Sequence, residues 1–336
     1  MDRSATTRTI AGVVALSLAF VGTVITLNLT LYSASDFVGS YLSALARKDI
    51  QGALVMPGVE KAGTETAGAE KPSVGERALL NPLAMPSLAM PSLTDVRLVK
   101  DSTAKNGTHT VVYSYRVNTT AATSSFEVAP TTATFGVFSA WRFTKSPLST
   151  LSVTALHGTE FSANDLPIVA TAASTPVSLL VLTPSSVKLS HHSLYLTAAT
   201  THTLVSTPGT IVPAIVDIQA NTAFVTEVRK ALNKDLADCV TQKVLLPTGC
   251  PMGQQIRDRM QNTPTWTMVN YPEVKIVAGA VAGSWEVPRT KAVAHVSVTV
   301  KSIFDGSISH FSKDVPFTVG YTIALTDTSI AISAQY

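Results

Sequence analysis

The chain has 336 residues, of which 46% are hydrophobic and 14% are charged, and its formal net charge is +3. A chain of this length exceeds the roughly 250 residues at which a single hydrophobic core stops growing, so we expect more than one domain. Its lysines and arginines are scattered among acidic residues and form no basic stripe. Nucleic-acid binding therefore has no electrostatic basis, and we expect no nucleic-acid partner.

The longest apolar stretch lies near the N-terminus. Residues 9–31 contain no charged side chain and are long enough to cross a hydrocarbon core of about 30 Å, and Arg3 and Arg8 precede them. This charge distribution predicts a cytoplasmic tail over residues 1–8, a transmembrane helix over residues 9–31 and a single-pass membrane protein. A cleaved signal peptide is the alternative, although its apolar core normally has about 7 to 15 residues. Both interpretations place the C-terminal body outside the cytoplasm.

The chain has two cysteines, Cys239 and Cys250. An isolated pair in an exported protein most simply forms a disulfide bond. Closing a loop of about 12 residues stabilises a fold by roughly 3 kcal/mol in the chain-entropy model. A zinc site would need further ligands nearby, and a catalytic thiol would need a basic setting, whereas this loop is rich in proline and glycine. We therefore predict a disulfide between Cys239 and Cys250.

The first part of the body is predicted to be one helix followed by strands. Residues 36–55 carry apolar side chains at helical spacing, and a proline and a glycine then end this pattern. Residues 59–92 contain few periodic apolar residues and two consecutive copies of Leu-Ala-Met-Pro-Ser, which predicts a flexible loop. The alternative is a lid on the first domain, with methionine supplying adaptable contacts. From Thr94 onward apolar residues alternate, so residues 36–150 are predicted to form a helix plus a curved antiparallel sheet.

The rest of the body contains a strand-only middle and a repeat of the first pattern. Residues 151–220 hold short alternating runs broken by prolines, which predicts a small β-sandwich. Residues 221–336 repeat the order of helix, irregular loop and antiparallel strands, beginning with a helix over residues 221–240. We therefore predict an α+β protein in which one N-terminal transmembrane helix precedes two helix-plus-curved-antiparallel-sheet domains that flank a small all-β module.

Two resemblances accompany these patterns. Residues 37–49 follow the pattern Phe-Val-x-x-Tyr-Leu-x-Ala-Leu-x-x-x-Asp, and with the strands after them they resemble the nuclear-transport-factor-2-like fold, in which a curved sheet wraps a helix. The exported region, particularly residues 239–253 and 315–320, resembles an uncharacterised family of membrane-anchored extracytoplasmic proteins of high-GC Gram-positive bacteria (actinobacteria). Ketosteroid isomerases of the first fold use a pocket carboxylate with a tyrosine or a protonated acid. No strand positions here match that set, so neither resemblance implies an activity.

A search for catalytic and metal-binding patterns finds only isolated matches. Three histidines lie near one another in the sequence: His191, His192 and His202. Adjacent histidines on a strand point to opposite faces, so we expect no metal site. The nucleophile pattern of penicillin-recognising enzymes occurs twice without its Lys-Thr-Gly strand, at Ser102 and Lys105 and at Ser185 and Lys188. We expect no cofactor and no catalytic site.

These patterns favour a binding role. We expect a non-catalytic cell-envelope protein that binds a partner protein, a lipid or a wall polymer through a concave sheet face. The alternative is an enzyme of the isomerase or dehydratase type, which would need a buried carboxylate with a raised pKa inside one cone-like domain. The acids nearest to apolar runs are Asp95, Asp217, Glu273 and Glu286. The tryptophans are expected to be buried rather than to form a glycan platform, and they are Trp141, Trp266 and Trp285.

Overall fold

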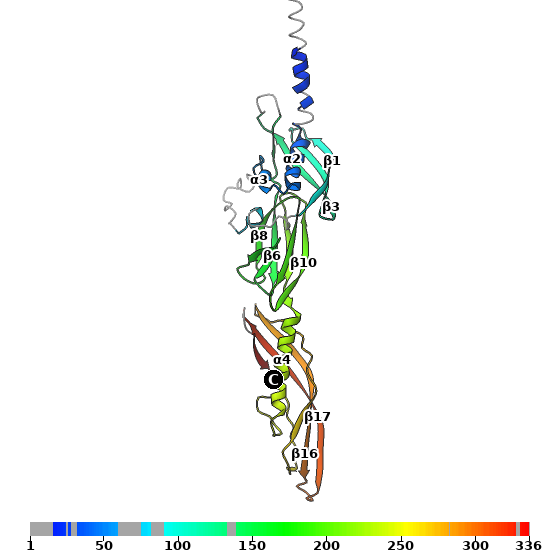
Figure 1. Ribbon diagram of the computed structural model, residues 1–336, viewed down its shortest axis with the longest axis vertical. Coiled ribbons are helices and arrows are strands. Elements are labelled where there is room, and N and C mark those ends of the chain that lie inside the picture. The colour runs from blue at the N-terminus through cyan, green and yellow to red at the C-terminus, as the bar shows by residue number, and fades with distance from the viewer. Residues whose placement is uncertain are drawn as a thin grey trace, which may run out of the picture.

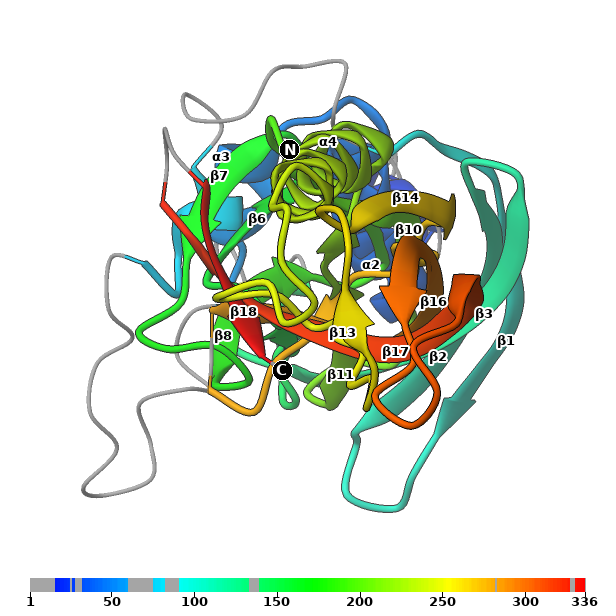
Figure 2. The ribbon, with the colours of Figure 1, turned by 90° about the horizontal axis from the view of Figure 1, so that it is seen from below.

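The computed structural model is an α+β fold made mostly of strands, with few helices. It describes residues 16–24, 26–27, 32–59, 75–81, 91–132, 139–281, 283–326 and 330–335. The molecule is elongated, with the N-terminal helical segment at one end and a long β-hairpin at the other (Figure 1). Figure 2 looks along the long axis and shows the first sheet curled into an open half-barrel.

The N-terminal segment is helical where the structure describes it. Residues 16–24 and 26–27 form helix that stands out from the body (Figure 1). The side chains of Leu16, Leu18 and Phe20 are 76%, 68% and 62% exposed. Within the described ranges, the structure has no helix that is both long enough and apolar enough to cross a membrane. The predicted tail and much of the predicted span at residues 9–31 lie outside the described residues, as does most of the predicted loop at residues 59–92.

The first region packs a helix on an antiparallel sheet. Helix α2 (Ala34–Ala46) begins where the Ser33 side chain accepts a hydrogen bond from the Asp36 amide, and α3 (Ile50–Leu54) follows. The sheet has the order β1-β2-β3-β4, with β1 (Leu93–Thr103), β2 (His109–Val117), β3 (Thr120–Pro130) and β4 (Trp141–Phe143). Tyr41 on α2 packs its ring edge-on against Phe126 and Phe143 of the sheet. Side chains of α2 thus fill the concave face of this sheet.

Two sheets form the middle of the molecule. One has five strands in the order β12-β10-β9-β6-β7 and the other has three in the order β11-β5-β8. Their bounds are β5 (Leu148–Leu156), β6 (Glu160–Ala163), β7 (Leu166–Val169), β8 (Pro176–Leu182), β9 (Ser185–His192), β10 (Leu196–Val205), β11 (Ile211–Asp217) and β12 (Gln219–Ala220). The short helix η2 (Ala78–Leu80) lies against β8, where the Leu180 amide donates to the Glu76 carbonyl at 2.7 Å. Because β5 pairs with β8 and β11, the middle sheets begin at Leu148, before the expected boundary at residue 151.

The first region and the middle sheets share one continuous cluster of buried apolar side chains, from Ala34 to Ile218. Hydrogen bonds also join them. The Tyr41 hydroxyl donates to the Thr183 carbonyl at 2.8 Å. Ser124 on β3 bonds the Tyr115 hydroxyl and donates to the Ser206 carbonyl beyond β10. Because these groups are buried, leaving one without a partner would be costly, so the bonds hold the two parts together.

The C-terminal region has its own core. Helix α4 (Thr222–Val240) starts at Asn221, whose side chain accepts from the Phe224 amide, and it ends near the Cys239–Cys250 disulfide, whose Cα atoms are 5.8 Å apart. The sheet is built from β13 (Arg259–Met260), β14 (Thr265–Asn270), β15 (Val277–Ala278), β16 (Ser284–Lys301), β17 (Ile308–Leu325) and β18 (Ile330–Gln335). Phe224, Leu232 and Trp285 belong to a separate cluster of buried side chains. The predicted disulfide is present in the structure.

The start of α4 attaches the C-terminal region to the middle sheets. The Asn221 side-chain amide donates to the Ser193 and Leu194 carbonyls at 3.3 and 3.0 Å, in the turn between β9 and β10. The Tyr195 ring lies 5.6 Å from that of Phe224. One residue therefore both caps the helix and fixes it to the preceding sheet, which favours a defined angle between the two parts.

Candidate functional site

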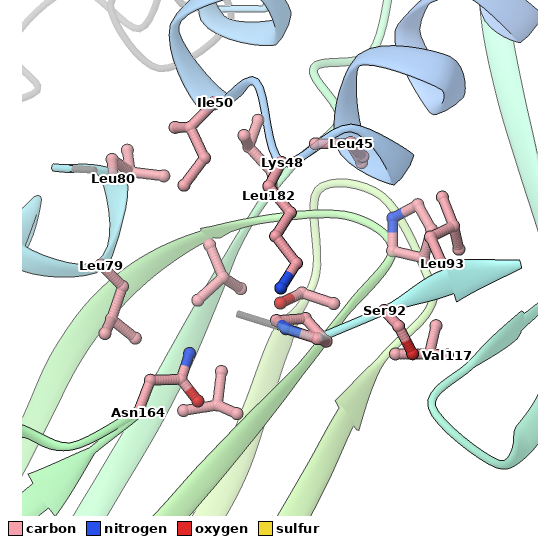
Figure 3. Close-up of a pocket in the computed structure, with 15 residues that line it drawn as sticks. Leu45, Lys48, Ile50, Leu79, Leu80, Ser92, Leu93, Val117, Asn164 and Leu182 are labelled. Atoms are coloured by element: carbon pink, nitrogen blue, oxygen red, sulfur yellow. The ribbon is translucent and has the colours of Figure 1, made fainter. Parts of the chain in front are cut away.

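The candidate site is an apolar pocket where α2, α3 and η2 meet the turn between β8 and β9 (Figure 3). Its cavity volume is about 60 Å³. Most of its lining is aliphatic, and the walls include Leu45, Ile50, Leu80, Leu93, Leu182 and Val187. These residues come from segments far apart in the sequence, so the pocket exists only because the first region packs on the middle sheets.

A tight link between two helices forms the upper wall. Lys48 follows α2 with a φ of +62°, and its amide donates to the Leu45 carbonyl at 2.9 Å. Asp49 then accepts from the Gly52 amide at 2.8 Å and so caps α3. The left-handed residue reverses the chain direction, and Leu45 and Ile50 therefore line the same space. The expected single helix over residues 36–55 is thus two helices.

The lower wall comes from the middle sheets. Leu182, Pro184 and Val187 lie at the turn between β8 and β9, and Thr183 is fixed there by a hydroxyl contact with Ser149 at 2.9 Å. Asn164, which is 4% exposed, accepts from the Lys188 amide at 2.9 Å. A buried amide that is bonded to a neighbouring strand makes this wall rigid.

Lys48 contributes the positive charge of the pocket. Its side chain is half-buried and extends from the end of α2 into the space between the two walls (Figure 3). The other polar lining residues are neutral: Ser92, Asn164 and Ser185. The described lining contains no acidic residue and no histidine. Such a pocket can hold an apolar group beside an anion.

The four acids proposed for an enzyme lie elsewhere. Asp95 is 60% exposed and 3.4 Å from Arg116, and Asp217 is 55% exposed and 3.2 Å from His157. Glu273 is exposed and Glu286 is partly exposed. The pKa of Asp36, in the first turn of α2, is raised by partial burial. None of the four predicted acids is enclosed in an apolar pocket, which is the arrangement that the isomerase-type alternative requires.

The other sequence matches are structural or isolated. His192 pairs with Thr197 across the β9–β10 ladder and His202 pairs with Lys188, and the described residues include no group of three potential metal ligands. Lys188 forms an ion pair with Asp165 at 2.5 Å. Trp266 and Trp285 are 3% and 1% exposed, whereas the indole of Trp141 donates to the Tyr32 carbonyl at 2.8 Å. Trp266 and Trp285 are therefore core residues, and neither provides a stacking surface.

The sequence patterns did not indicate a cluster of polar side chains that lies on the β16–β17 hairpin. His295 and His310 are far from the other histidines in the sequence, yet both lie on the outer face of the β16–β17 hairpin. His295 lies between Asp314 and Ser312, with contacts of 2.6 and 2.9 Å. Alternation placed these residues on strands, but only the pairing register brings them together.

Comparisons with protein-family models, with curated proteins and with solved structures found no match. The resemblances to the nuclear-transport-factor-2-like fold and to actinobacterial envelope proteins therefore stay predictions.

Proposed function

We propose that this is a membrane-anchored binding protein of the cell envelope, and that the pocket around Lys48 holds the charged head and the first carbons of an anionic amphiphile such as a fatty acid. In this proposal residues 9–31 cross the membrane, the N-terminus is cytoplasmic and the body is extracytoplasmic. The pocket binds its ligand without changing it. The observation that carries the proposal is the aliphatic lining with one lysine directed into it.

The anchor is supported by exposed apolar side chains. Leu16, Leu18 and Phe20 project from a helical segment that makes no part of either buried cluster. A lipid bilayer is a favourable surrounding for such side chains, at roughly 0.8 kcal/mol for each buried methylene group. The Cys239–Cys250 disulfide agrees with an oxidising compartment for the body.

The nature of the ligand follows from the lining. Aliphatic walls favour a hydrocarbon chain, and a lysine ammonium favours a carboxylate or phosphate. The cavity accepts only a few carbons, and a separate, larger hollow of about 700 Å³ shares the lining residue Leu80 with it. Arg77 lines that hollow. A ligand with a chain of several carbons thus has space beyond the pocket.

The fold supports a duplicated design. We propose that residues 36–150 and 221–336 are cone-like modules of one type, flanking a small all-β module at residues 151–220. Both regions place a long helix against an antiparallel sheet, α2 in the first and α4 in the second. In the first region the helix side chains occupy the concave face, so we place ligand binding beside the helix end rather than in the sheet.

Photo-crosslinking tests the proposed site. The full chain in lipid nanodiscs is exposed to a fatty acid with a diazirine on a carbon near its carboxylate, and labelled peptides are identified by mass spectrometry. We expect labels on segments containing Leu80, Leu93 and Leu182. Lys48→Gln should lower labelling at a subsaturating ligand concentration by roughly tenfold, because a charge-assisted contact is worth about 1.4 kcal/mol or more.

Two controls make this test specific. Lys105→Gln removes the same charge from the exposed turn between β1 and β2 and should leave labelling unchanged. Ser92→Phe places a ring at the pocket wall and should reduce labelling without removing a charge. Labelling that avoids the pocket, or that is equal in Lys48→Gln and the unaltered protein, would refute the proposal.

A further inference from the structure

The outer face of the β16–β17 hairpin carries a row of polar side chains. In the antiparallel register, His295 faces Asp314, Ser297 faces Ser312 and Thr299 faces His310. Side chains two residues apart lie on the same face of a strand, so these six residues share one face. Ala294, Val296 and Val298 point the other way and are buried in the C-terminal core. The row is therefore fixed by the same register that builds the core.

Three members of this row are ordered as acid, imidazole and hydroxyl. An Asp314 carboxylate oxygen lies 2.6 Å from His295 Nδ1, and His295 Nε2 lies 2.9 Å from Ser312 Oγ. The carboxylate contact favours the tautomer with hydrogen on Nδ1, which leaves Nε2 to accept the Ser312 hydroxyl proton. This is the arrangement that makes a serine nucleophilic, and it is recognised by geometry rather than by sequence order.

The neighbouring pair supplies a further polar group. Ser297 faces Ser312 across the ladder, and its hydroxyl lies 3.0 Å from His310 Nε2. When His310 carries hydrogen on Nε2, it donates to Ser297 and leaves the Ser297 hydroxyl hydrogen for another acceptor. Because Ser297 faces Ser312 in the ladder, we assign that hydrogen to the oxygen of an attacked carbonyl, where negative charge would develop.

A second set of acid, imidazole and hydroxyl, at the opposite end of the molecule, lacks this geometry. Asp101 lies 2.7 Å from His109 Nδ1, but the Thr103 hydroxyl is 3.2 Å from Nε2 and 3.5 Å from Nδ1. A hydroxyl that is nearly equidistant from both nitrogens lies over the ring and not along the Nε2 lone pair. The His109 ring also packs against Trp141 at 4.8 Å. Residue type alone therefore does not produce the aligned arrangement of the β16–β17 hairpin.

We propose that Ser312 is an acyl-accepting nucleophile, with His295 as its base, Asp314 as the residue that orients His295, and small uncharged esters as substrates. Ser312 Oγ bonds the ester carbon while His295 Nε2 takes the Oγ proton. The ester C–O bond then breaks, and the leaving alcohol receives that proton. Water, deprotonated by His295, attacks the acyl-serine and releases the acid and the free Ser312 hydroxyl. This activity is separate from the ligand binding proposed for the pocket.

Solvent exposure of the Asp314 and His295 side chains limits the expected reaction rate and the class of substrate. The Asp314 side chain is 63% exposed and that of His295 is 33% exposed, so solvent screens their interaction. Ser312 is itself exposed on β17. We therefore expect slow reaction with activated, sterically open acyl groups and little discrimination between them.

Active-site labelling tests the assignment. The full chain in nanodiscs is treated with a biotinylated fluorophosphonate, and modified peptides are mapped by mass spectrometry. We expect an adduct on Ser312 and none on Thr103. His295→Gln should lower the labelling rate on the order of 100-fold, as expected for loss of a general base, and Asp314→Asn should lower it by a smaller factor. Ser309→Ala, which removes an exposed hydroxyl from the same strand, should leave the rate unchanged.

Two labelling results would refute the proposal. Absence of a Ser312 adduct in the folded, disulfide-bonded protein refutes the proposal. Equal labelling of Ser312 in Asp314→Asn, His295→Gln and the unaltered chain refutes it as well, because the adduct would then be non-specific. Should His295→Gln fail to fold, as judged by circular dichroism, Asp314→Asn alone decides, since it retains size and shape at an exposed position.

Discussion

The two helix-on-sheet regions differ in how their buried cores are formed. The first has a four-stranded sheet whose last strand is only Trp141–Phe143, and its core continues into the middle sheets. The C-terminal region has two strands of 18 residues each, a longer helix and a disulfide, and it closes a core of its own. The same order of elements therefore gives one region whose buried cluster continues into the neighbouring sheets and one whose buried cluster is separate. We call residues 34–218, which comprise the first region and the middle sheets, the N-terminal unit, and we call residues 221–335 the C-terminal unit.

This difference also bears on where the proposed ligand pocket lies. In the N-terminal unit the seam between the first sheet and the middle sheets leaves a gap next to the end of α2. In the C-terminal unit helix and sheet bury Phe224, Trp285 and Val319 almost completely. Pockets commonly form where separately built parts meet, and the N-terminal unit has such a junction inside it.

The largest expected effect is from Tyr41→Ala. This residue is fully buried, contacts two rings and bonds the Thr183 carbonyl, so its loss should lower the free energy of unfolding of the N-terminal unit by about 3–5 kcal/mol. Both the first sheet and the middle sheets should be affected. Hydrogen exchange resolved by peptide measures this, and unchanged protection in the middle sheets would contradict a shared core.

Phe224→Ala is the matched variant in the other unit. Phe224 is fully buried and contacts Trp285, so the expected loss is of similar size and concentrated in residues 221–335, with a smaller effect around Tyr195, whose ring it also contacts. If both variants destabilised both units equally, the comparison between an integrated unit and a separate one would be wrong.

The next effect concerns the disulfide. Replacing Cys239 and Cys250 together by serine should lower the stability of the C-terminal unit by roughly 3 kcal/mol, because the unfolded chain regains the entropy of an open loop. The N-terminal unit should not respond. Thermal unfolding with a fluorescent reporter in each unit separates the two, and a shift of the N-terminal transition would show coupling between them.

A smaller effect is expected from Ser124→Ala. This serine is 3% exposed and links the Tyr115 hydroxyl to the Ser206 carbonyl, so its removal leaves buried polar groups without a partner. The expected cost is about 1–3 kcal/mol, in the N-terminal unit alone. Denaturant titration measures it, and Ser309→Ala on the exposed hairpin is the control that should change nothing.

Alkaline pH should weaken the N-terminal unit. Burial raises the pKa of the Tyr41 hydroxyl well above its ordinary value, and burial also raises those of Tyr113 and Tyr115. The unfolded chain releases these protons first, so stability is fully present below about pH 10 and is lost as the pH rises further. Tyr41, whose pKa is raised the most of the three, should contribute the largest part of this loss. Tyr41→Phe should remove that part of the pH dependence, and an unaltered pH profile would contradict it.

Much of the local structure was predictable from the sequence. Asn221 is a good helix cap, and α4 over Thr222–Val240 agrees closely with the expected helix. Alternating residues after Thr94 form strands, and the isolated cysteine pair is bonded. The helix cap and the strand alternation depend on neighbouring residues, and the disulfide depends on two cysteines that have no other cysteine to pair with.

The site was not predictable in the same way. Tyr41 and Thr183 are 142 positions apart, and no local pattern indicates that α2 packs on the middle sheets. The break at Lys48 depends on a left-handed backbone conformation that lysine rarely adopts. The contact between Ser312 and His295 requires the register of two paired strands. Such features arise from tertiary packing, which single-sequence periodicity does not encode.

Hydrogen exchange of the full chain in nanodiscs, with and without dodecanoate, tests ligand binding at the pocket around Lys48. We expect slower exchange around Leu45 to Ile50, Leu79 to Leu80 and Val181 to Val187, which line the pocket, and no change in the C-terminal unit. Dodecanol, which lacks the charge, should protect these segments less. Unchanged exchange at the pocket with saturating dodecanoate, or protection that appears instead in the C-terminal unit, would contradict the assignment of the pocket around Lys48 as the binding site.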